Sequence, residues 1–313
     1  TDSVLAIHTS TRQDEWYTQQ SLDPVFWSTL GIFRRKLKCA DFAGLIIPAE
    51  ILYLYLVSPI QSFISGKKRM ILEPGKHFGG LPFEALIRKD VDSGSSLPAA
   101  PRYLVCDFEI VYLGVGQGDN LSESRLRDGC RDDCQNPDGI FSGFSSGGDS
   151  DHFLPDLPFA RAELAGIAEL WHQRGGVSII DTTTGRGLFH AFAQMIPRKV
   201  IHFAAHYNPG IGERTPGETA DLVVLNGCAT GVARENGTTS LPNLLHAAGV
   251  QNVLSTLWNV TDHVACSFMI DFYRTWLSGK SCGEALREVK IKWISRAETP
   301  LPALWAAYVL PGQ

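Results

Sequence analysis

Two stretches, VIHFAAHYNPG (200–210) and DLVVLNGCATG (221–231), carry the clearest structural signal in this chain. Each begins with a continuous apolar run, reaches a reactive side chain (His206 in one, Cys228 in the other) and continues to a glycine. A short apolar run without alternation is typical of a strand buried on both faces of a parallel sheet. The two stretches therefore predict neighbouring strands that end on a histidine and a cysteine.

The segments around these strands alternate between two patterns. Helical spacing of apolar residues covers 159–174, 187–196, 241–249, 262–279 and 281–296, and apolar runs cover 177–181 and 250–258. Strands that alternate with helices indicate an α/β fold, with a mostly parallel sheet and helices on both faces. The first half is less regular: 1–42 is weakly patterned, 45–65 is helical, 69–74 and 108–116 are strands, and 117–152 is a long polar surface loop.

Composition excludes several classes of protein. The 313 residues are 44% hydrophobic with a formal net charge of -5, so nothing predicts direct binding to nucleic acid or to a membrane surface. The most apolar stretch, 45–60, is interrupted by Pro48, Glu50 and Pro59 and is expected to pack on a core. Seven scattered cysteines favour a reducing, cytoplasmic location, and the missing initiator Met suggests a trimmed chain.

His206 and Cys228 form a candidate catalytic pair. Adjacent strands lie about 4.8 Å apart, so side chains that leave the carboxyl ends of two neighbouring strands can reach each other where open sheets bind ligands. An imidazole can deprotonate the thiol, which then acts as a nucleophile, and the imidazolium protonates the leaving group. Backbone amides at Gly227 and Cys228 are candidates for an oxyanion hole.

Spacing alone is equally compatible with a purely structural role for His206 and Cys228. A cysteine at a buried strand end is commonly a small core residue, and a histidine there is often hydrogen-bonded in the core. His202, four residues before His206, lies on the same strand face within the strand body and competes as the base.

Six motifs in order resemble the CHAT domain, a caspase-like and separase-related protease domain often found with TPR repeats. They are LPFEALI (81–87), ARAEL (160–164), HFAAH (202–206), DLVVLNGCATG, LWNVTD (257–262) and LWAAYVLPG (304–312), with the helix EALREV between the last two. The resemblance implies a caspase-like three-layer fold and a catalytic dyad of Cys228 and His206. It divides the chain into an N-terminal extension with a packing helix (1–66) and the CHAT domain (67–313).

The resemblance also implies partners. Its members act on protein substrates and are joined to TPR domains, CRISPR effectors, gasdermin-linked proteins or other defence and signalling partners. The connection 207–219 is rich in Gly and Pro and lacks helical spacing, so we expect a protease that stays latent until a regulatory protein or a further domain activates it. No metal or cofactor is implied: GVGQG (114–118) is read as a turn, and Cys130 and Cys134 of CRDDC as loop residues without a second ligand pair.

Two departures from the family pattern stand near the histidine. The family usually has Gly directly after it, whose amide helps to bind the oxyanion, and here the residue is Tyr207. The connection 207–219 is also near the minimum for a parallel crossover and lacks helical spacing, which suggests that a stretch is missing from the sequence.

Three residues are expected at the substrate cleft: Asn226, Trp258 and Asp262. Asp262 is either a helix cap or a carboxylate that favours Arg or Lys before the scissile bond. Asn226 stands where relatives specific for basic residues often carry Asp, so the evidence on specificity is divided. The main reading is a cysteine endopeptidase. The alternatives are a catalytically weak caspase-like interaction module and a Cys-dependent acyl hydrolase of small molecules.

Overall fold

The computed structural model describes residues 3–10, 15–88, 101–113, 139–145, 157–182, 198–205, 220–227, 241–247, 249–296 and 301–311. The helix expected at 187–196 and the turn expected at 114–118 lie outside these ranges.

A six-stranded sheet forms the centre of the molecule, in the order β12-β11-β10-β9-β7-β8. Its members are β7 (Ile140–Ser145), β8 (Val177–Asp181), β9 (Arg198–Ala204), β10 (Leu222–Asn226), β11 (Asn252–Thr256) and β12 (Tyr308–Val309). All neighbouring strands are parallel except β12, which is antiparallel to β11. The predicted α/β fold with a mostly parallel sheet is thus confirmed.

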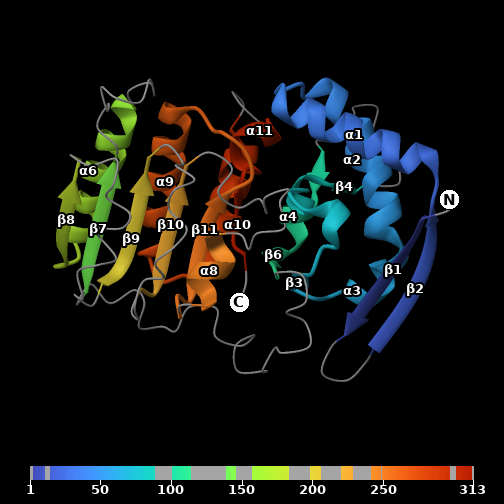
Figure 1. Ribbon diagram of the computed structural model, residues 1–313, viewed down its shortest axis with the longest axis horizontal. Helices are drawn as coiled ribbons and strands as arrows, with labels where there is room; N and C mark the ends of the chain where they lie inside the picture. Colours follow the sequence, from blue (N-terminus) through green and yellow to red (C-terminus); the bar gives the residue numbers. More distant parts are fainter. Residues whose placement is uncertain are drawn as a thin grey trace.

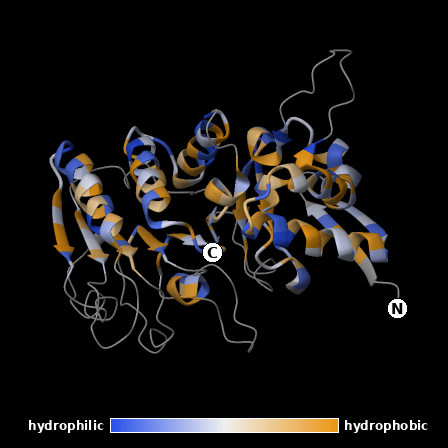
Figure 2. Cartoon of the chain, turned by 90° about the horizontal axis from the view of Figure 1, so that it is seen from above, coloured by the Kyte–Doolittle hydropathy of each residue, from blue (hydrophilic) through white to orange (hydrophobic). Residues whose placement is uncertain are grey.

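Helices cover both faces of this sheet (Figures 1 and 2). α6 (Pro158–His172), α9 (Asp262–Trp276) and α10 (Cys282–Ile294) share one core cluster with Phe141, Val200 and Leu254. α8 (Leu241–Ala247) lies over the other face, where Leu245 packs in a second cluster with Val223 and Val253. The alternation of buried residues along the strands therefore separates two hydrophobic layers and produces three layers in all.

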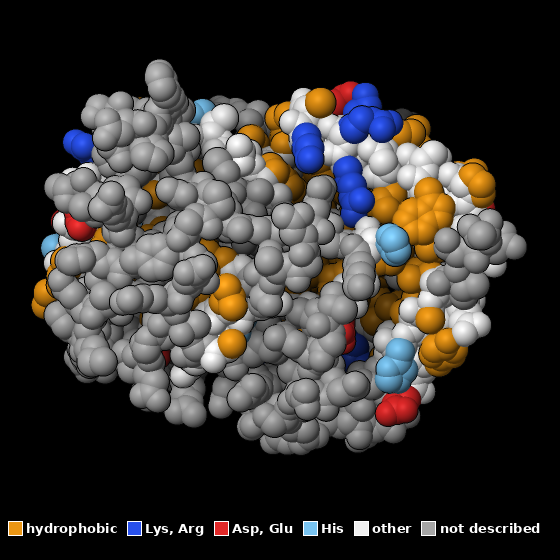
Figure 3. All heavy atoms as spheres, viewed as in Figure 1, with side chains coloured by type: hydrophobic (Ala, Val, Ile, Leu, Met, Phe, Trp, Pro, Cys, Tyr) orange, Lys and Arg blue, Asp and Glu red, His pale blue; other side chains and the backbone are white. Residues whose placement is uncertain are grey.

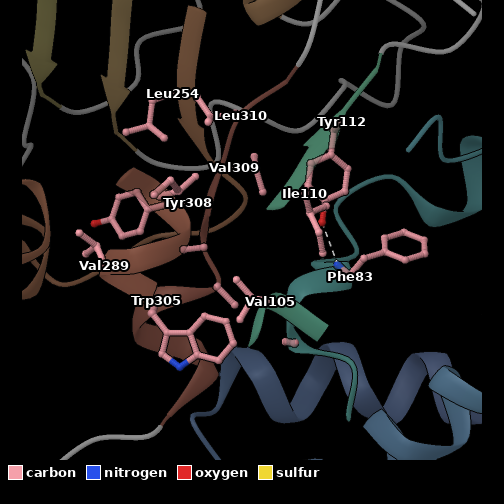
Figure 4. Packing of buried hydrophobic residues seen from close by; sticks show 14 of the residues in the cluster. Phe83, Val105, Ile110, Tyr112, Leu254, Val289, Trp305, Tyr308, Val309 and Leu310 are labelled. Atoms are coloured by element: carbon pink, nitrogen blue, oxygen red, sulfur yellow. Dashed lines mark hydrogen bonds between the residues drawn. The ribbon is translucent and has the colours of Figure 1, made fainter. Parts of the chain in front are cut away.

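A second, smaller group of strands forms two separate two-stranded sheets. β3 (Arg69–Leu72) pairs with β6 (Glu109–Tyr112) in parallel, and β4 (Ile87–Arg88) pairs with β5 (Arg102–Tyr103). The Tyr112 amide donates to the Leu310 carbonyl at 3.1 Å and so joins β6 to the end of the chain. Figure 4 shows the side chain of Val309 beside that of Ile110 in this junction. The short helical elements of the chain are η1 (Ser58–Ile60), α3 (Gln61–Ile64), η2 (Lys76–Phe78), η3 (Phe83–Ala85), α4 (Leu104–Asp107) and α11 (Pro302–Trp305).

The N-terminal region is more ordered than its sequence pattern indicates. β1 (Ser3–Ser10) and β2 (Glu15–Leu22) form an antiparallel hairpin, followed by α1 (Pro24–Lys38) and α2 (Ala43–Leu56). The hairpin gives a weak signal because β2 alternates only between exposed and half-buried positions until Leu22. Asp23 caps α1 by accepting a hydrogen bond from the Phe26 amide at 2.8 Å. Figure 3 shows Lys and Arg side chains gathered over these helices.

Helix α2 packs as the apolar stretch predicts, with its buried side chains in the main core cluster. Within the described ranges, no single helix is long and apolar enough to cross a membrane. The bent pair Ala43–Leu56 and Ser58–Ile64 passes that test by length and composition alone.

The expectation of a surface loop over 117–152 is wrong at β7, which lies inside the sheet between β9 and β8. The segment IFSGFS is short and rich in small residues, so it resembles a loop in composition. Its small residues serve close packing instead: a Cβ on Gly143 would lie 2.8 Å from Cδ2 of Leu164, a fully buried residue of α6. A larger residue would therefore require the Leu164 side chain to shift within the core between α6 and the sheet.

Candidate active site

The carboxyl ends of β9 and β10 form the edge where the site is expected. The two strands are parallel neighbours, and Ala204 pairs with Asn226 as the last partners in register. His206 and Cys228 each follow these paired residues by two positions in the sequence, and both lie outside the described residues. The described ends of β9 and β10 therefore meet at one edge of the sheet at the same level.

Gly227 is the last described residue before the cysteine. Its carbonyl oxygen accepts a hydrogen bond from the Thr256 hydroxyl, at the end of the neighbouring strand β11. Of the two amides expected to bind an oxyanion, that of Gly227 is thus at the edge, and that of Cys228 lies beyond the described residues.

Asn226 faces helix α6. Its amide nitrogen donates to Oε1 of Glu163 at 2.7 Å, and Glu163 is only 1% exposed. The expected substrate-contacting residue is therefore held by a buried carboxylate through the same amide group that would otherwise face a substrate.

His202 belongs to the same buried network. Its Nε2 lies 2.6 Å from Oε1 of Glu163 and its Nδ1 lies 3.0 Å from the Tyr273 hydroxyl, and the histidine has no exposed surface. Burial, and then the charge of Glu163, raises the pKa of Tyr273 well above its usual value, so the hydroxyl stays protonated. Both ring nitrogens of His202 are engaged inside the core, which argues against its competing with His206 as the base.

Trp258 and Asp262 follow β11 at the same edge. Trp258 packs against the core cluster, and its Nε1 donates to the Ala303 carbonyl at 2.9 Å. Asp262 begins α9, and its Oδ2 accepts from the Phe159 amide at 2.8 Å. Asp262 thus caps α6 rather than its own helix, because α6 and α9 both begin at this edge.

Sequence reasoning missed Glu163, Thr256 and Tyr273. Glu163 had a readable signal: it lies among the buried positions of α6, which recur at helical spacing. A carboxylate on the apolar face of a helix needs a buried partner. Thr256 and Tyr273 gave no such signal, since threonine in a strand and tyrosine in a packed helix are ordinary.

The described residues offer little support for a metal site or for a second reactive cysteine. No group of three His, Cys, Asp or Glu side chains there could hold a metal ion, and Cys130 and Cys134 lie outside them. Cys266 on α9 is a protonated thiol: burial, and then the charges of Glu163 and Asp262, raise its pKa to about 11. A thiol in that state is a poor nucleophile at neutral pH.

Comparison with known families matches the model of the CHAT domain over residues 47–210 and 211–313. The chain belongs to the CHAT domain family. The division of the match falls within the short connection between His206 and Cys228. The predicted family is confirmed.

Solved structures add a distant likeness. One is the crystal structure of the Arg-specific cysteine proteinase gingipain R, with a TM-score of 0.48 and 9% sequence identity. The match covers 90% of this chain and 73% of the gingipain chain. The complex of the Porphyromonas gingivalis RgpB pro- and mature domains has a TM-score of 0.44 and 10% identity, covering 93% and 77%. No curated protein matches the chain.

Proposed function

We propose that this CHAT domain is a cysteine endopeptidase that cleaves a protein partner, with Cys228 as the nucleophile and His206 as the acid–base. The observation that supports it is the register of β9 and β10. Their last paired residues, Ala204 and Asn226, stand equally far in sequence from the histidine and the cysteine. Side chains at equivalent positions beyond neighbouring parallel strands are well placed to share one site.

The proposed reaction is acyl transfer. The Cys228 thiolate attacks the scissile carbonyl carbon, and the displaced electron pair forms an oxyanion that the amides near Gly227 stabilise. Collapse of this intermediate expels the amine, which takes its proton from the His206 imidazolium. Water then attacks the thioester, with His206 as the base, and releases the acid.

Regulation and location are part of the proposal. We place the enzyme in the cytoplasm, in a defence or signalling system, latent until a regulatory protein or a further domain activates it. The scattered cysteines motivate the location, the Gly- and Pro-rich connection 207–219 motivates the latency, and the family resemblance motivates the defence or signalling role.

The first test replaces each member of the dyad. Cys228→Ala and His206→Ala should both abolish cleavage of a fluorogenic peptide library while leaving the thermal unfolding midpoint nearly unchanged. His206→Ala should also slow alkylation of Cys228 by iodoacetamide about tenfold at pH 7, because an unassisted thiol is mostly protonated. His172→Ala is the matched control, because this exposed histidine ends α6 and contacts Ser178.

The same experiment separates the second candidate, a catalytically weak interaction module, which Tyr207 in place of the usual Gly favours. That function predicts no cleavage, and alkylation of Cys228 that does not depend on His206. Cleavage that survives Cys228→Ala would end the protease assignment.

A further inference from the structure

One face of the hairpin formed by helices α1 and α2 is apolar and exposed to solvent. On α2, Ile47 is 66% exposed and Leu54 is 53% exposed, with the half-buried Ile51 between them. On α1, Val25 is 55% exposed, and Ile32, two turns later, is half-buried. This spacing places the side chains of each helix in a stripe along its axis. We call these five residues the apolar stripes.

The two stripes lie on the same side of the hairpin. A Cβ on Gly44, at the start of α2, would lie 2.9 Å from Cε of Lys36 in the last turn of α1. At the other end, the rings of Phe26 and Tyr55 lie 5.2 Å apart, so the two helices are antiparallel. Each of these contact residues comes one position after an exposed residue of its own helix, which is a rotation of about 100°. Two antiparallel helices that rotate in the same sense toward each other present their exposed stripes on one common side.

Basic side chains gather at one end of this surface. Arg35, Lys36 and Lys38 lie in the last turn of α1, and Arg35 follows Ile32 by one turn on the same stripe. Asp41 pairs with Lys36 at 2.5 Å, whereas Arg35 and Lys38 are exposed and form no ion pair within the described part of the chain. Figure 3 shows hydrophobic and basic side chains together over these helices. The surface is thus positive at one end, in a chain with a formal net charge of -5.

These features fit an amphipathic helix better than a lipid surface. Side chains at helical spacing on two neighbouring antiparallel helices form the kind of surface on which a third helix packs. The positive charge at the end of α1 favours carboxylates at the matching end of that helix. The carboxylates of Asp23 and Asp41 stand at the two ends of the hairpin, where anionic lipid head groups would repel them.

We propose that α1 and α2 form a docking site for an amphipathic helix of a partner protein with an acidic end. The apolar side of that helix covers Ile47, Ile51 and Leu54. Its carboxylates meet Arg35 and Lys38. This inference goes beyond the proposed protease function, because α1 and α2 lie away from β9 and β10 (Figure 1).

Fluorescence anisotropy of labelled peptides, titrated with the full chain, tests the docking site. The acidic peptide is a helix of about five turns with Leu along one face and Glu in both end turns. The basic peptide has Lys in place of Glu, and the polar peptide has Ser in place of Leu. Ile47→Gln and Leu54→Gln remove apolar surface, and Arg35→Glu reverses a charge. Val177→Gln is the matched control, because Val177 is 61% exposed on β8.

We expect the acidic peptide to bind about three- to tenfold more tightly than the basic peptide at low salt, and the polar peptide to show no binding. Ile47→Gln and Leu54→Gln should each weaken binding of the acidic peptide about tenfold, because a branched side chain loses its burial. Val177→Gln should stay within about twofold of the wild type. Arg35→Glu should reverse the preference between the two charged peptides. All variants should keep the thermal unfolding midpoint of the wild type, because the replaced side chains are exposed.

Several outcomes would overturn the inference. If the acidic peptide does not bind, or binds the Ile47→Gln and Leu54→Gln variants as it binds the wild type, the hairpin is not its docking site. Equal affinity for the acidic and basic peptides would rule out an acidic partner. Binding to phosphatidylserine vesicles that both Gln variants abolish would assign the surface to a membrane. A dimer in sedimentation velocity that both variants dissociate would assign it to a second copy of this chain.

Discussion

The buried carboxylate of Glu163 organises the side chains beneath the ends of β9 and β10. Glu163 lies on the buried face of α6, where a carboxylate without partners would be costly. His202 and Asn226 both contact its Oε1, so one oxygen connects α6 with β9 and β10. Removing one partner of such a buried pair would leave a polar group in the core without its hydrogen bond. The contacts of His202 therefore account for its place in the core by structure alone, without a part in chemistry.

Asp262 offers a test of capping against substrate recognition. Asp262→Ala removes the acceptor of the Phe159 amide at the start of α6 and should lower the free energy of unfolding by about 1 kcal/mol. Asp262→Asn keeps an acceptor oxygen and should stay closer to the wild type. Urea unfolding of the three proteins measures this difference.

A cleavage profile over a peptide library then decides whether the carboxylate also selects substrates. If it does, Asp262→Asn should lose any preference for Arg or Lys before the scissile bond. Identical profiles together with the lower stability of Asp262→Ala would leave capping as its role, whereas equal stability of all three proteins would contradict capping.

Helices α9 and α10 are joined by one mostly buried carboxylate. Asp271 of α9 accepts hydrogen bonds from Lys292 at 2.8 Å, Trp293 at 3.1 Å and Arg296 at 2.7 Å. Burial by itself would raise the pKa of Asp271. The bonds from Lys292 and Trp293, and the charges of Lys292 and Arg296, outweigh burial and hold this pKa below its usual value. The pair of helices is therefore stabilised by the ionised form.

The sign of this shift predicts the pH dependence. Because the folded-state pKa of Asp271 is lowered, its contribution is fully present above the ordinary carboxyl pKa of about 3.9 and is lost as pH falls through the folded-state value. Asp271→Asn should lower the free energy of unfolding by about 1–3 kcal/mol at pH 7 and by clearly less near pH 2.5. Urea titrations at both pH values measure it, with the exposed Glu169→Gln as control. A difference that stays constant with pH would contradict the assignment.

Across the whole molecule, the junction between the main sheet and the smaller strands contains a buried ion pair. Nζ of Lys290, on α10, lies 2.8 Å from Oε1 of Glu84, in the LPFEALI segment, and both residues are 1% exposed. The Tyr112 hydroxyl donates to the other Glu84 oxygen and accepts from the Phe83 amide at 2.9 Å, a bond drawn in Figure 4. This network connects the region of the smaller strands to the helices on the main sheet.

We expect the two charges to be strongly coupled. Lys290→Met leaves Glu84 buried without its partner and should lower the free energy of unfolding by about 3–5 kcal/mol. The double variant Glu84→Gln with Lys290→Met removes both charges, retains an acceptor for Tyr112, and should recover part of that loss. Denaturant unfolding of the wild type, both single variants and the double variant measures the coupling. Simple addition of the two single effects would show that the pair does not act as a unit.

Local sequence patterns predicted most of the elements around the site. The continuous apolar runs of β9 and β10 and the helical spacing of α6, α9 and α10 report burial directly, because each residue's environment repeats with the period of its own element. The same patterns placed Asn226 and Trp258 near the ends of their strands and Asp262 at the start of the next helix. They failed for β7, whose small residues resemble a loop until Leu164 of α6 is brought against Gly143.

The partners of each side chain depend on contacts between distant segments. Glu163 meets Asn226, Thr256 meets Gly227, and Asp262 meets the start of α6, across 63, 29 and 103 residues of sequence. Periodicity along a chain records which face of an element is buried, but it does not record which other element covers that face. The sequence was therefore sufficient for the family and for most strands of the sheet, whereas the buried network beneath β9 and β10 exists only once α6, β9, β10 and β11 are packed together.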